Sequence, residues 1–138
     1  MTNLHRNRTG RLGVLAAAMT ATVLPVTLLA AVPASANDRD VIREGNCSGS
    51  ADWKLKASPE NGRIEVEGEI DSNRNGQSWR WRLLHNGSLS DRGSRTTRAP
   101  SGSFEVRRVV VDLRGTDTLM FRATNPATGE TCRGVVNF

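Results

Sequence analysis

From residue 51 to the C-terminus, the chain consists of short runs in which apolar and polar residues alternate. Side chains two positions apart on a strand lie on the same face, so this alternation predicts half-buried β-strands. Clusters of Gly, Pro, Asn and Asp predict the turns between them, and Asn86-Gly87 in particular predicts a hairpin. The apolar positions predict strands at 53–57, 64–70, 79–83, 104–113, 119–123 and 132–136, with a weaker strand near Leu89. About six or seven strands without a helix signal predict an all-β antiparallel sandwich.

The predicted strand at 104–113 contains one interruption of its alternation. Phe104 and Val106 occupy even positions, whereas three apolar residues after Arg107-Arg108 occupy odd positions. These later residues are Val109, Val111 and Leu113. One extra residue in a strand shifts the alternation in this way, and a β-bulge supplies such a residue. We therefore expect a bulge or bend at Arg107-Arg108.

Residues 1–36 have the composition of a secretory signal peptide. Their arginines are Arg6, Arg8 and Arg11. An uncharged segment at 14–32 follows, and Ala34-Ser35-Ala36 then places small residues where a signal peptidase cleaves. A membrane anchor is the alternative, because the uncharged segment is just long enough to span a bilayer, but Pro25 disfavours a helix there. We predict cleavage after Ala36 and a secreted, extracellular protein that has no membrane segment afterwards.

The exported part contains two cysteines, Cys47 and Cys132. Outside the cell, two cysteines normally form one disulfide bond. Residues 37–50 are polar and Gly-containing, which predicts a flexible N-terminal arm ahead of a single β-sandwich domain at 51–138. We expect the disulfide to tie this arm to the last strand.

The number and spacing of the predicted strands resemble the immunoglobulin-like and fibronectin type III sandwiches. The order Cys47, Trp79, Cys132 is similar to the Cys–Trp–Cys order of antibody domains, although here the second cysteine lies in the last predicted strand. The Ala-rich leader and the excess of arginine, 14 residues against two lysines in 37–138, resemble small secreted proteins of high-GC Gram-positive bacteria. These resemblances imply an architecture and an exported bacterial protein, and neither implies an activity.

The net charge of the chain adds little to this interpretation. The whole chain has 19 basic and 14 acidic residues, and removal of the leader leaves 16 and 14. Basic and acidic residues are interleaved along the remaining chain. Nucleic-acid binding requires basic residues clustered on one face, so this interleaving predicts no nucleic-acid partner.

Trp79 and Trp81 are a candidate aromatic platform, because two indoles on one strand face can stack against sugar rings. The alternative is that they belong to the core. If the tryptophans faced outward, Arg80 and Arg82 would face inward, and burial of unpaired arginines is costly. The alternation therefore favours the core for both tryptophans.

Three carboxylates, Glu65, Glu67 and Glu69, are predicted to share one strand face. Glycosidases use a carboxylate pair, but nothing in the sequence indicates the burial that separates two carboxyl pKa values. We interpret the row as a solvated face. If its strand paired directly with the one at 79–83, Arg80 and Arg82 would lie opposite as a charge ladder.

Two further patterns are candidate sites. The segment Asp71–Gly76 matches the first half of a calcium-binding loop, but Arg82 occupies the position where such a loop needs a bidentate glutamate. A plain turn is the better interpretation. His85 is the one histidine after the leader, and a Ser-His-Asp triad would have to use it, yet no nucleophile motif accompanies it.

The segment 90–103 is long for a hairpin connection and carries Arg92, Arg95 and Arg98. Long loops on small sandwiches commonly make the binding contacts, so these arginines are the candidate binding loop.

We expect a secreted, monomeric, non-catalytic binding or interaction domain, with no catalytic residues, no metal site and no cofactor. Its partner would be an extracellular protein or a cell-envelope component. A secreted protease inhibitor that presents residues 91–100 is one alternative. A carbohydrate- or cell-wall-binding module that uses Trp79 and Trp81 is another.

Overall fold

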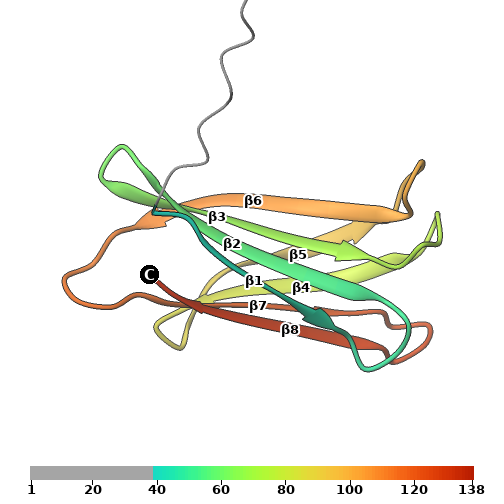
Figure 1. The fold of residues 1–138 in the computed structure, drawn as a ribbon. Helices are drawn as coiled ribbons and strands as arrows, with labels where there is room; N and C mark the ends of the chain where they lie inside the picture. The colour runs from blue at the N-terminus through green and yellow to red at the C-terminus, as the bar shows by residue number, and fades with distance from the viewer. Residues whose placement is uncertain (1–38) are drawn as a thin grey trace, which may run out of the picture. The chain divides into compact units, whose positions relative to one another are not determined.

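A computed structural model describes residues 39–138, which form a sandwich of two antiparallel four-stranded sheets (Figure 1). Sheet 1 contains, in spatial order, β1 (Val41–Asn46), β2 (Asp52–Glu60), β3 (Arg63–Asp71) and β6 (Ser103–Val111). Sheet 2 contains β5 (Ser88–Thr96), β4 (Ser78–His85), β7 (Thr118–Thr124) and β8 (Thr131–Asn137). The all-β sandwich is therefore confirmed. The predicted signal peptide lies outside the described residues, and within them no helix is long and apolar enough to cross a bilayer.

The structure has more strands than the alternation predicted. Residues 41–46, expected to belong to a loose arm, form β1, which pairs antiparallel with β2 from Val41 opposite Ala57 to Asn46 opposite Asp52. The weak strand expected near Leu89 is the nine-residue strand β5. Both are edge strands with few apolar residues, so the alternation of the sequence showed them poorly.

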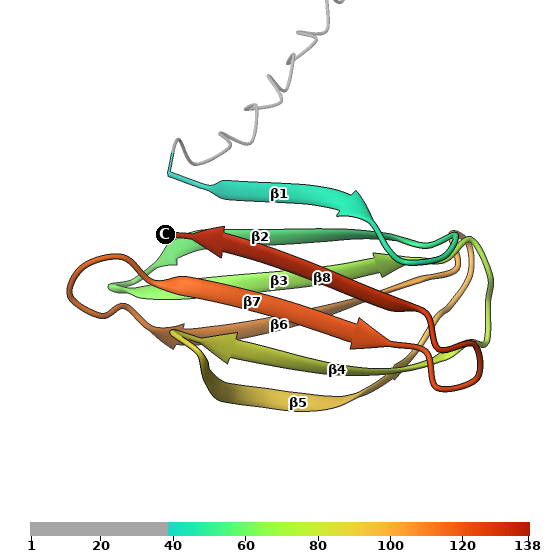
Figure 2. The same ribbon diagram turned by 90° about the horizontal axis from the view of Figure 1, so that it is seen from below.

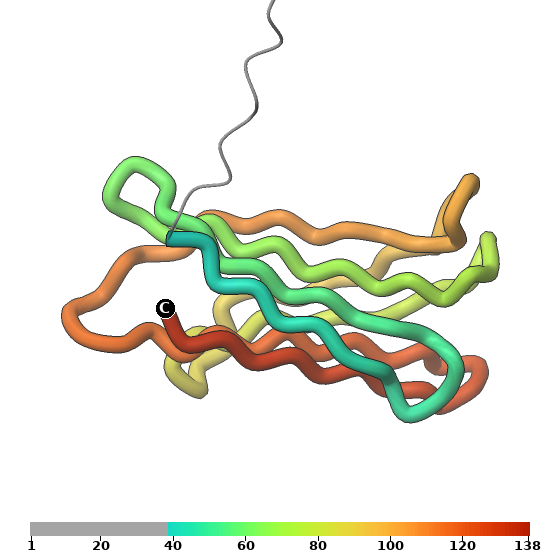
Figure 3. The backbone as a smooth tube through the Cα atoms, in the orientation of Figure 1, coloured from blue at the N-terminus to red at the C-terminus, as the bar shows by residue number. Residues whose placement is uncertain are grey.

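Two tight hairpins set the register within the sheets (Figure 3). Asn61-Gly62 joins β2 to β3 with φ angles of 50° and 75°, and Asn86-Gly87 joins β4 to β5 with 49° and 81°. Two consecutive residues with positive φ form the type I′ turn, whose twist matches that of the flanking strands. The hairpin predicted at Asn86-Gly87 is confirmed.

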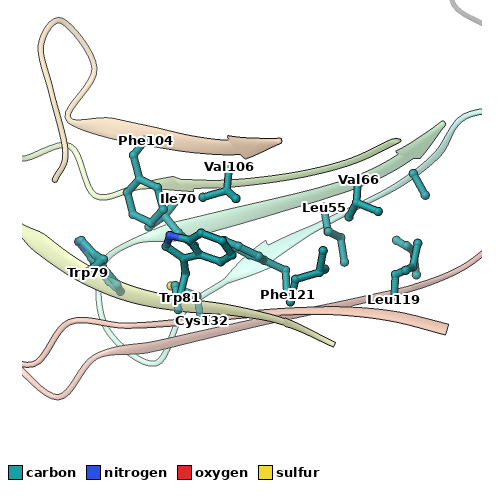
Figure 4. Packing of buried hydrophobic residues seen from close by; sticks show 14 of the residues in the cluster. Leu55, Val66, Ile70, Trp79, Trp81, Phe104, Val106, Leu119, Phe121 and Cys132 are labelled. Atoms are coloured by element: carbon teal, nitrogen blue, oxygen red, sulfur yellow. The ribbon is translucent and has the colours of Figure 1, made fainter. Parts of the chain in front are cut away.

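The core lies between the two sheets, and its largest side chains are aromatic (Figure 4). Trp79 and Trp81 from β4 are 0% and 3% exposed. Trp79 packs against Phe104 of the opposite sheet with ring centroids 6.5 Å apart, and Trp81 stacks on Phe121 at 6.2 Å. The prediction that both tryptophans belong to the core is confirmed.

Glycines on the inner faces leave room for aromatic rings of the facing sheet. A Cβ atom on Gly68 of β3 would lie 2.6 Å from the Phe121 ring, and one on Gly134 of β8 would lie 2.5 Å from the Trp53 ring. No real contact is this short, so the two sheets approach to their observed separation only because these positions carry no side chain.

The bulge expected at Arg107-Arg108 is absent from β6. This strand pairs with β3 in unbroken register from Ser103 to Val111, so the regular alternation continues and Arg108 faces inward. Its guanidinium lies 5.0 Å above the Trp81 ring and pairs with Asp91 of β5. An arginine with an aromatic face and a carboxylate as partners is tolerated at an inward position. As a result, Val110 faces inward and is 6% exposed, whereas Val109, Val111 and Leu113 face solvent and are 42%, 55% and 48% exposed.

The predicted disulfide between Cys47 and Cys132 is present. It connects the segment after β1 to β8, at the side of the sandwich where β1 and β8 lie near each other (Figures 1 and 2). Ser48 reinforces the connection, because its amide donates to the Thr131 carbonyl and its hydroxyl accepts from the Thr131 amide, at 2.8 and 2.9 Å. The bond thus covalently joins the two sheets across 85 positions of sequence.

We expect replacement of both cysteines, Cys47→Ala with Cys132→Ala, to lower the free energy of unfolding by about 4–5 kcal/mol. Opening so long a loop restores chain entropy to the unfolded state. Urea unfolding of the oxidised protein and of this variant measures the difference. An unchanged unfolding midpoint would contradict the expected stabilisation.

We expect Gly68→Ala to destabilise the protein by about 1–3 kcal/mol, because the new methyl group overpacks the core at Phe121. Phe121→Leu removes the ring, so the double variant should lose less than the sum of the two single losses. A double-mutant cycle of urea unfolding checks this coupling. Additive losses would show that the methyl group and the ring do not meet.

Candidate functional site

The predicted binding loop is mostly a strand. β5 extends to Thr96, so only residues 97–102 connect it to β6. Arg92 lies on the outward face of sheet 2, opposite Arg82, whereas Arg95 lies opposite the inward-facing Trp79. Arg98 lies beyond the strand, in a bridge with Ser103. The structure therefore separates the three candidate arginines instead of presenting them on one loop.

A row of four arginines crosses the outward face of sheet 2. Arg82 of β4 lies opposite Arg92 of β5 on one side and opposite Arg122 of β7 on the other. Arg122 in turn lies opposite Arg133 of β8. All four side chains are exposed. These residues, here called the arginine row, come from every strand of the sheet.

Two other rows lie beside the arginine row on the same face. On one side, Arg80 lies opposite Ser94 and Thr124, and Thr124 lies opposite Thr131. The three hydroxyl residues, Ser94, Thr124 and Thr131, are here called the hydroxyl row. On the other side is an apolar row of Leu89, Leu84, Met120 and Val135. Leu89, at the edge, is 53% exposed, and the other three apolar side chains are half-buried. Together with Arg80, the arginine row and the hydroxyl row are here called the arginine face.

The arginine face has no acidic partner. None of the outward positions in β5, β4, β7 and β8 is an aspartate or glutamate. Among residues 39–138, no ion pair involves any of its five arginines, which are Arg80, Arg82, Arg92, Arg122 and Arg133. Basic and acidic residues that are interleaved along the sequence are therefore separated on this face of the folded domain.

Sheet 1 shows the opposite arrangement on its outward face. Glu67 lies between Lys56 of β2 and Arg107 of β6, and Glu69 lies opposite Lys54 of β2. Lys54 of β2 pairs with Glu69 at 2.5 Å, and Arg107 of β6 pairs with Glu67 at 2.9 Å. The charge ladder expected with Arg80 and Arg82 does not form, because those residues belong to the other sheet. The glutamate row is a surface ion-pair network.

The surface is hollowed between β4 and β5 at the arginine face. The hollow has a volume of about 530 Å³. Three of the five arginines line it, namely Arg80, Arg82 and Arg92, together with Leu89 and Ser94. Arg95 and Arg98 line a separate hollow of about 470 Å³ beside Phe104 and Glu105. The charged residues that line the first hollow are all arginines, whereas those of the second include the carboxylate of Glu105.

His85 belongs to a buried polar cluster at the end of the sandwich where the C-terminus lies. Its Nε2 atom pairs with Asp117, whose side chain is 1% exposed. The same carboxylate accepts hydrogen bonds from the Leu113 amide at 2.9 Å and from Asn86 Nδ2 at 3.1 Å. The main chain of Asp117 exchanges two hydrogen bonds of 2.9 Å with Phe138. The cluster thus fastens the β4–β5 turn, the β6–β7 loop and the C-terminus together.

Burial raises the pKa of Asp117, but the hydrogen bonds from His85, Leu113 and Asn86 outweigh it and hold the pKa below its usual value. A histidine paired with a buried aspartate is also the base of a nucleophilic triad. Within residues 39–138, however, no serine or cysteine side chain is hydrogen-bonded to His85. The role that this arrangement supports is anchoring of the loops.

Two other sequence candidates have structural explanations. Trp79 and Trp81 are buried, so they offer no face to a sugar ring. In the turn after β3, Asp71 Oδ1 accepts a hydrogen bond of 3.0 Å from the Asn73 amide. No group of three or more metal-ligating side chains occurs among residues 39–138.

Sequence analysis missed the arginine face for a specific reason. Each arginine is recognisable as outward-facing, since Arg80 and Arg82 flank Trp81, and Arg122 follows Phe121. What the sequence does not show is which strands become neighbours and in which register. The signal that was available was the absence of acidic residues at the outward positions of these strands.

Asp117→Ala should lower the free energy of unfolding by about 3–5 kcal/mol, because it leaves His85 and two amide donors without their buried acceptor. Asp112→Ala, on the exposed part of the same loop, should change it by less than about 0.5 kcal/mol. Because the folded-state pKa of Asp117 is depressed, its contribution is complete above about pH 4 and is lost as the pH falls through the folded-state value. Urea midpoints between pH 2 and 7 measure both effects. Similar acid sensitivity of the wild type and Asp117→Asn would contradict this assignment.

No family model, curated protein or solved structure matches this chain. A role for the protein is therefore argued from the chemistry of the described residues alone.

Proposed function

We propose that the chain is a secreted, non-catalytic binding domain and that the arginine face of sheet 2 is its contact surface. The observation that carries this proposal is the gathering of five exposed arginines from four strands on one face without an acidic residue. The ligand is an extracellular molecule or cell-envelope component that carries negative charge.

The energetics of the face support a binding role. Like charges directly opposite each other on neighbouring strands destabilise a sheet. The arginine row contains three such pairs, Arg92–Arg82, Arg82–Arg122 and Arg122–Arg133, and no described carboxylate offsets them. A bound anion removes this repulsion. The sheet also fixes the backbone positions of the arginines before binding, so that the ligand has to order only their side chains.

Export is part of the proposal. Disulfide bonds form and persist in oxidising compartments, and the Cys47–Cys132 bond joins two sheets through residues far apart in sequence. This supports removal of residues 1–36 as a signal peptide. The order of the strands other than β1, with β2-β3-β6 facing β5-β4-β7-β8, supports a relationship to the immunoglobulin-like sandwiches.

The residues predicted for the two alternative roles support those roles less well than the arginines support the proposed one. A sugar-binding module needs exposed tryptophans, and both candidates are in the core. A protease inhibitor needs an exposed loop at 91–100, and most of that segment is strand β5.

The arginine face can be tested with two variants of equal charge. Arg82→Gln with Arg122→Gln removes the two central arginines of the row and keeps most of each side-chain stem. Arg74→Gln with Arg114→Gln removes two exposed arginines from turns outside the face. Each immobilised protein is exposed to culture supernatant and cell-wall extract of the producing organism at about 0.15 M salt, where distant charges are screened.

We expect wild type and the turn variant to retain the same component and the face variant to lose it by about tenfold or more. This is the loss expected if each arginine contributes about 1 kcal/mol or more to binding. Equal retention by all three proteins would contradict the proposed contact surface.

A further inference from the structure

We infer that the arginine face binds a linear polyanion whose charges are phosphates, such as a phosphodiester-linked or polyphosphate chain. This inference rests on the proposed function and names the chemical class of its ligand. It is carried by the linear arrangement of the guanidinium groups, the hydroxyl groups beside them and the cation-lined hollow.

The arginine row has the shape of a line. Neighbouring strands lie about 4.8 Å apart, so three strand intervals place Arg92 and Arg133 about 14 Å from each other. The row runs perpendicular to the strands and crosses the whole sheet. A compact anion can reach one or two of these side chains at a time. An extended chain with repeated negative charges can contact all four.

The donor groups suit phosphate. All five cations of the face are arginines, whereas both lysines of the described residues, Lys54 and Lys56, lie on sheet 1 in ion pairs. The planar guanidinium forms paired hydrogen bonds with phosphate oxygens, which an ammonium group cannot match. Serine and threonine hydroxyls also donate to phosphate oxygens. Ser94, Thr124 and Thr131 supply such hydroxyls directly beside the row.

The hollow between β4 and β5 provides a position where several donors converge. Arg80, Arg82 and Arg92 line it together with Ser94. Its volume of about 530 Å³ is large enough for phosphate groups of a longer chain, and its other lining residues are Trp81, Leu89 and Gly93. The rest of the chain then continues along the row toward Arg122 and Arg133.

The other groups on the face argue against different polyanions and surfaces. Single-stranded nucleic acids bind largely by stacking bases on aromatic rings, and no outward position of sheet 2 is aromatic. A bilayer or a protein partner would use an exposed apolar centre. Here the arginine row occupies the centre, and the apolar row lies to one side, with only Leu89 more than half exposed.

The test measures binding of fluorescently labelled inorganic polyphosphate of defined length to the purified disulfide-bonded protein. The salt dependence of affinity counts the phosphates contacted, with a slope of about −0.7 per contact for single-stranded chains. Four contacts predict that affinity falls by about 50-fold between 50 and 200 mM salt. The Arg82→Gln/Arg122→Gln variant should lose only about sevenfold over this range and bind more weakly at 50 mM. The Arg74→Gln/Arg114→Gln variant should behave as wild type.

Thermal unfolding separates loss of binding from loss of folding. Because the central arginines repel their neighbours, the face variant should unfold at the same temperature as wild type or at a higher one. Weaker binding combined with unchanged or increased stability is the expected result. A face variant that unfolds early is replaced by Arg92→Gln with Arg133→Gln, which removes the ends of the same row.

Competing probes of matched charge identify other ligands. Tighter binding of heparin or poly-glutamate than of polyphosphate would overturn the phosphate assignment in favour of sulfate or carboxylate. Tighter binding of single- or double-stranded DNA would make the ligand a nucleic acid. Sedimentation with phosphatidylglycerol-containing vesicles, without polyphosphate binding, would make it a membrane surface.

Failure of this inference is distinguishable from failure of the proposed function. If polyphosphate does not bind at 50 mM salt, while a culture component is still retained through Arg82 and Arg122, only the phosphate assignment is wrong. If the face variant retains that component as well as wild type and polyphosphate does not bind, both proposals are wrong.

Discussion

The antiparallel register of β4 with β5 and β7 is the constraint on which both the core and the arginine face depend. The strand alternates strictly, so burial of Trp79 and Trp81 forces Arg80 and Arg82 to the outward side. The same register brings Arg92 and Arg122 opposite Arg82. A shift of the register of β4 by one residue would expose Trp79 and Trp81 and bury Arg80 and Arg82. The free-energy cost of that exchange fixes the register that forms the arginine row.

The two sides of the sandwich are closed by different interactions. On one side the disulfide and Trp53, which packs over Gly134, connect β1 and β2 to β8. On the other side Arg108 of β6 reaches over Trp81 to Asp91 of β5, and its hydrogen bond to Asp91 lowers the pKa of that carboxyl. Because both sides are fixed, the backbone of sheet 2 holds the positions of the arginines along its outward face constant relative to one another.

The two outward faces carry charge in different ways. On sheet 1, glutamates alternate with Lys54 and Arg107 in pairs that neutralise each other. On sheet 2, the arginines have only one another as charged neighbours. A protein under selection for stability alone gains nothing from such a row. The asymmetry between two faces of one small domain is the reason that we propose sheet 2, and not sheet 1, as the binding surface.

The sequence by itself determined the features that depend on local order along the chain. Alternation gave the strands with apolar faces and placed Trp79 and Trp81 in the core, Asn86-Gly87 gave a hairpin, and two cysteines gave the disulfide. Tertiary structure decided the features that depend on which strands become neighbours. Arg108 faces inward because it packs on Trp81 and pairs with Asp91, both from other strands. The arginine row exists because four separate strands align in register. Alternation has a period of two and can be recognised within a single strand. The neighbours of a strand and its pairing register are set by packing between residues far apart in the chain.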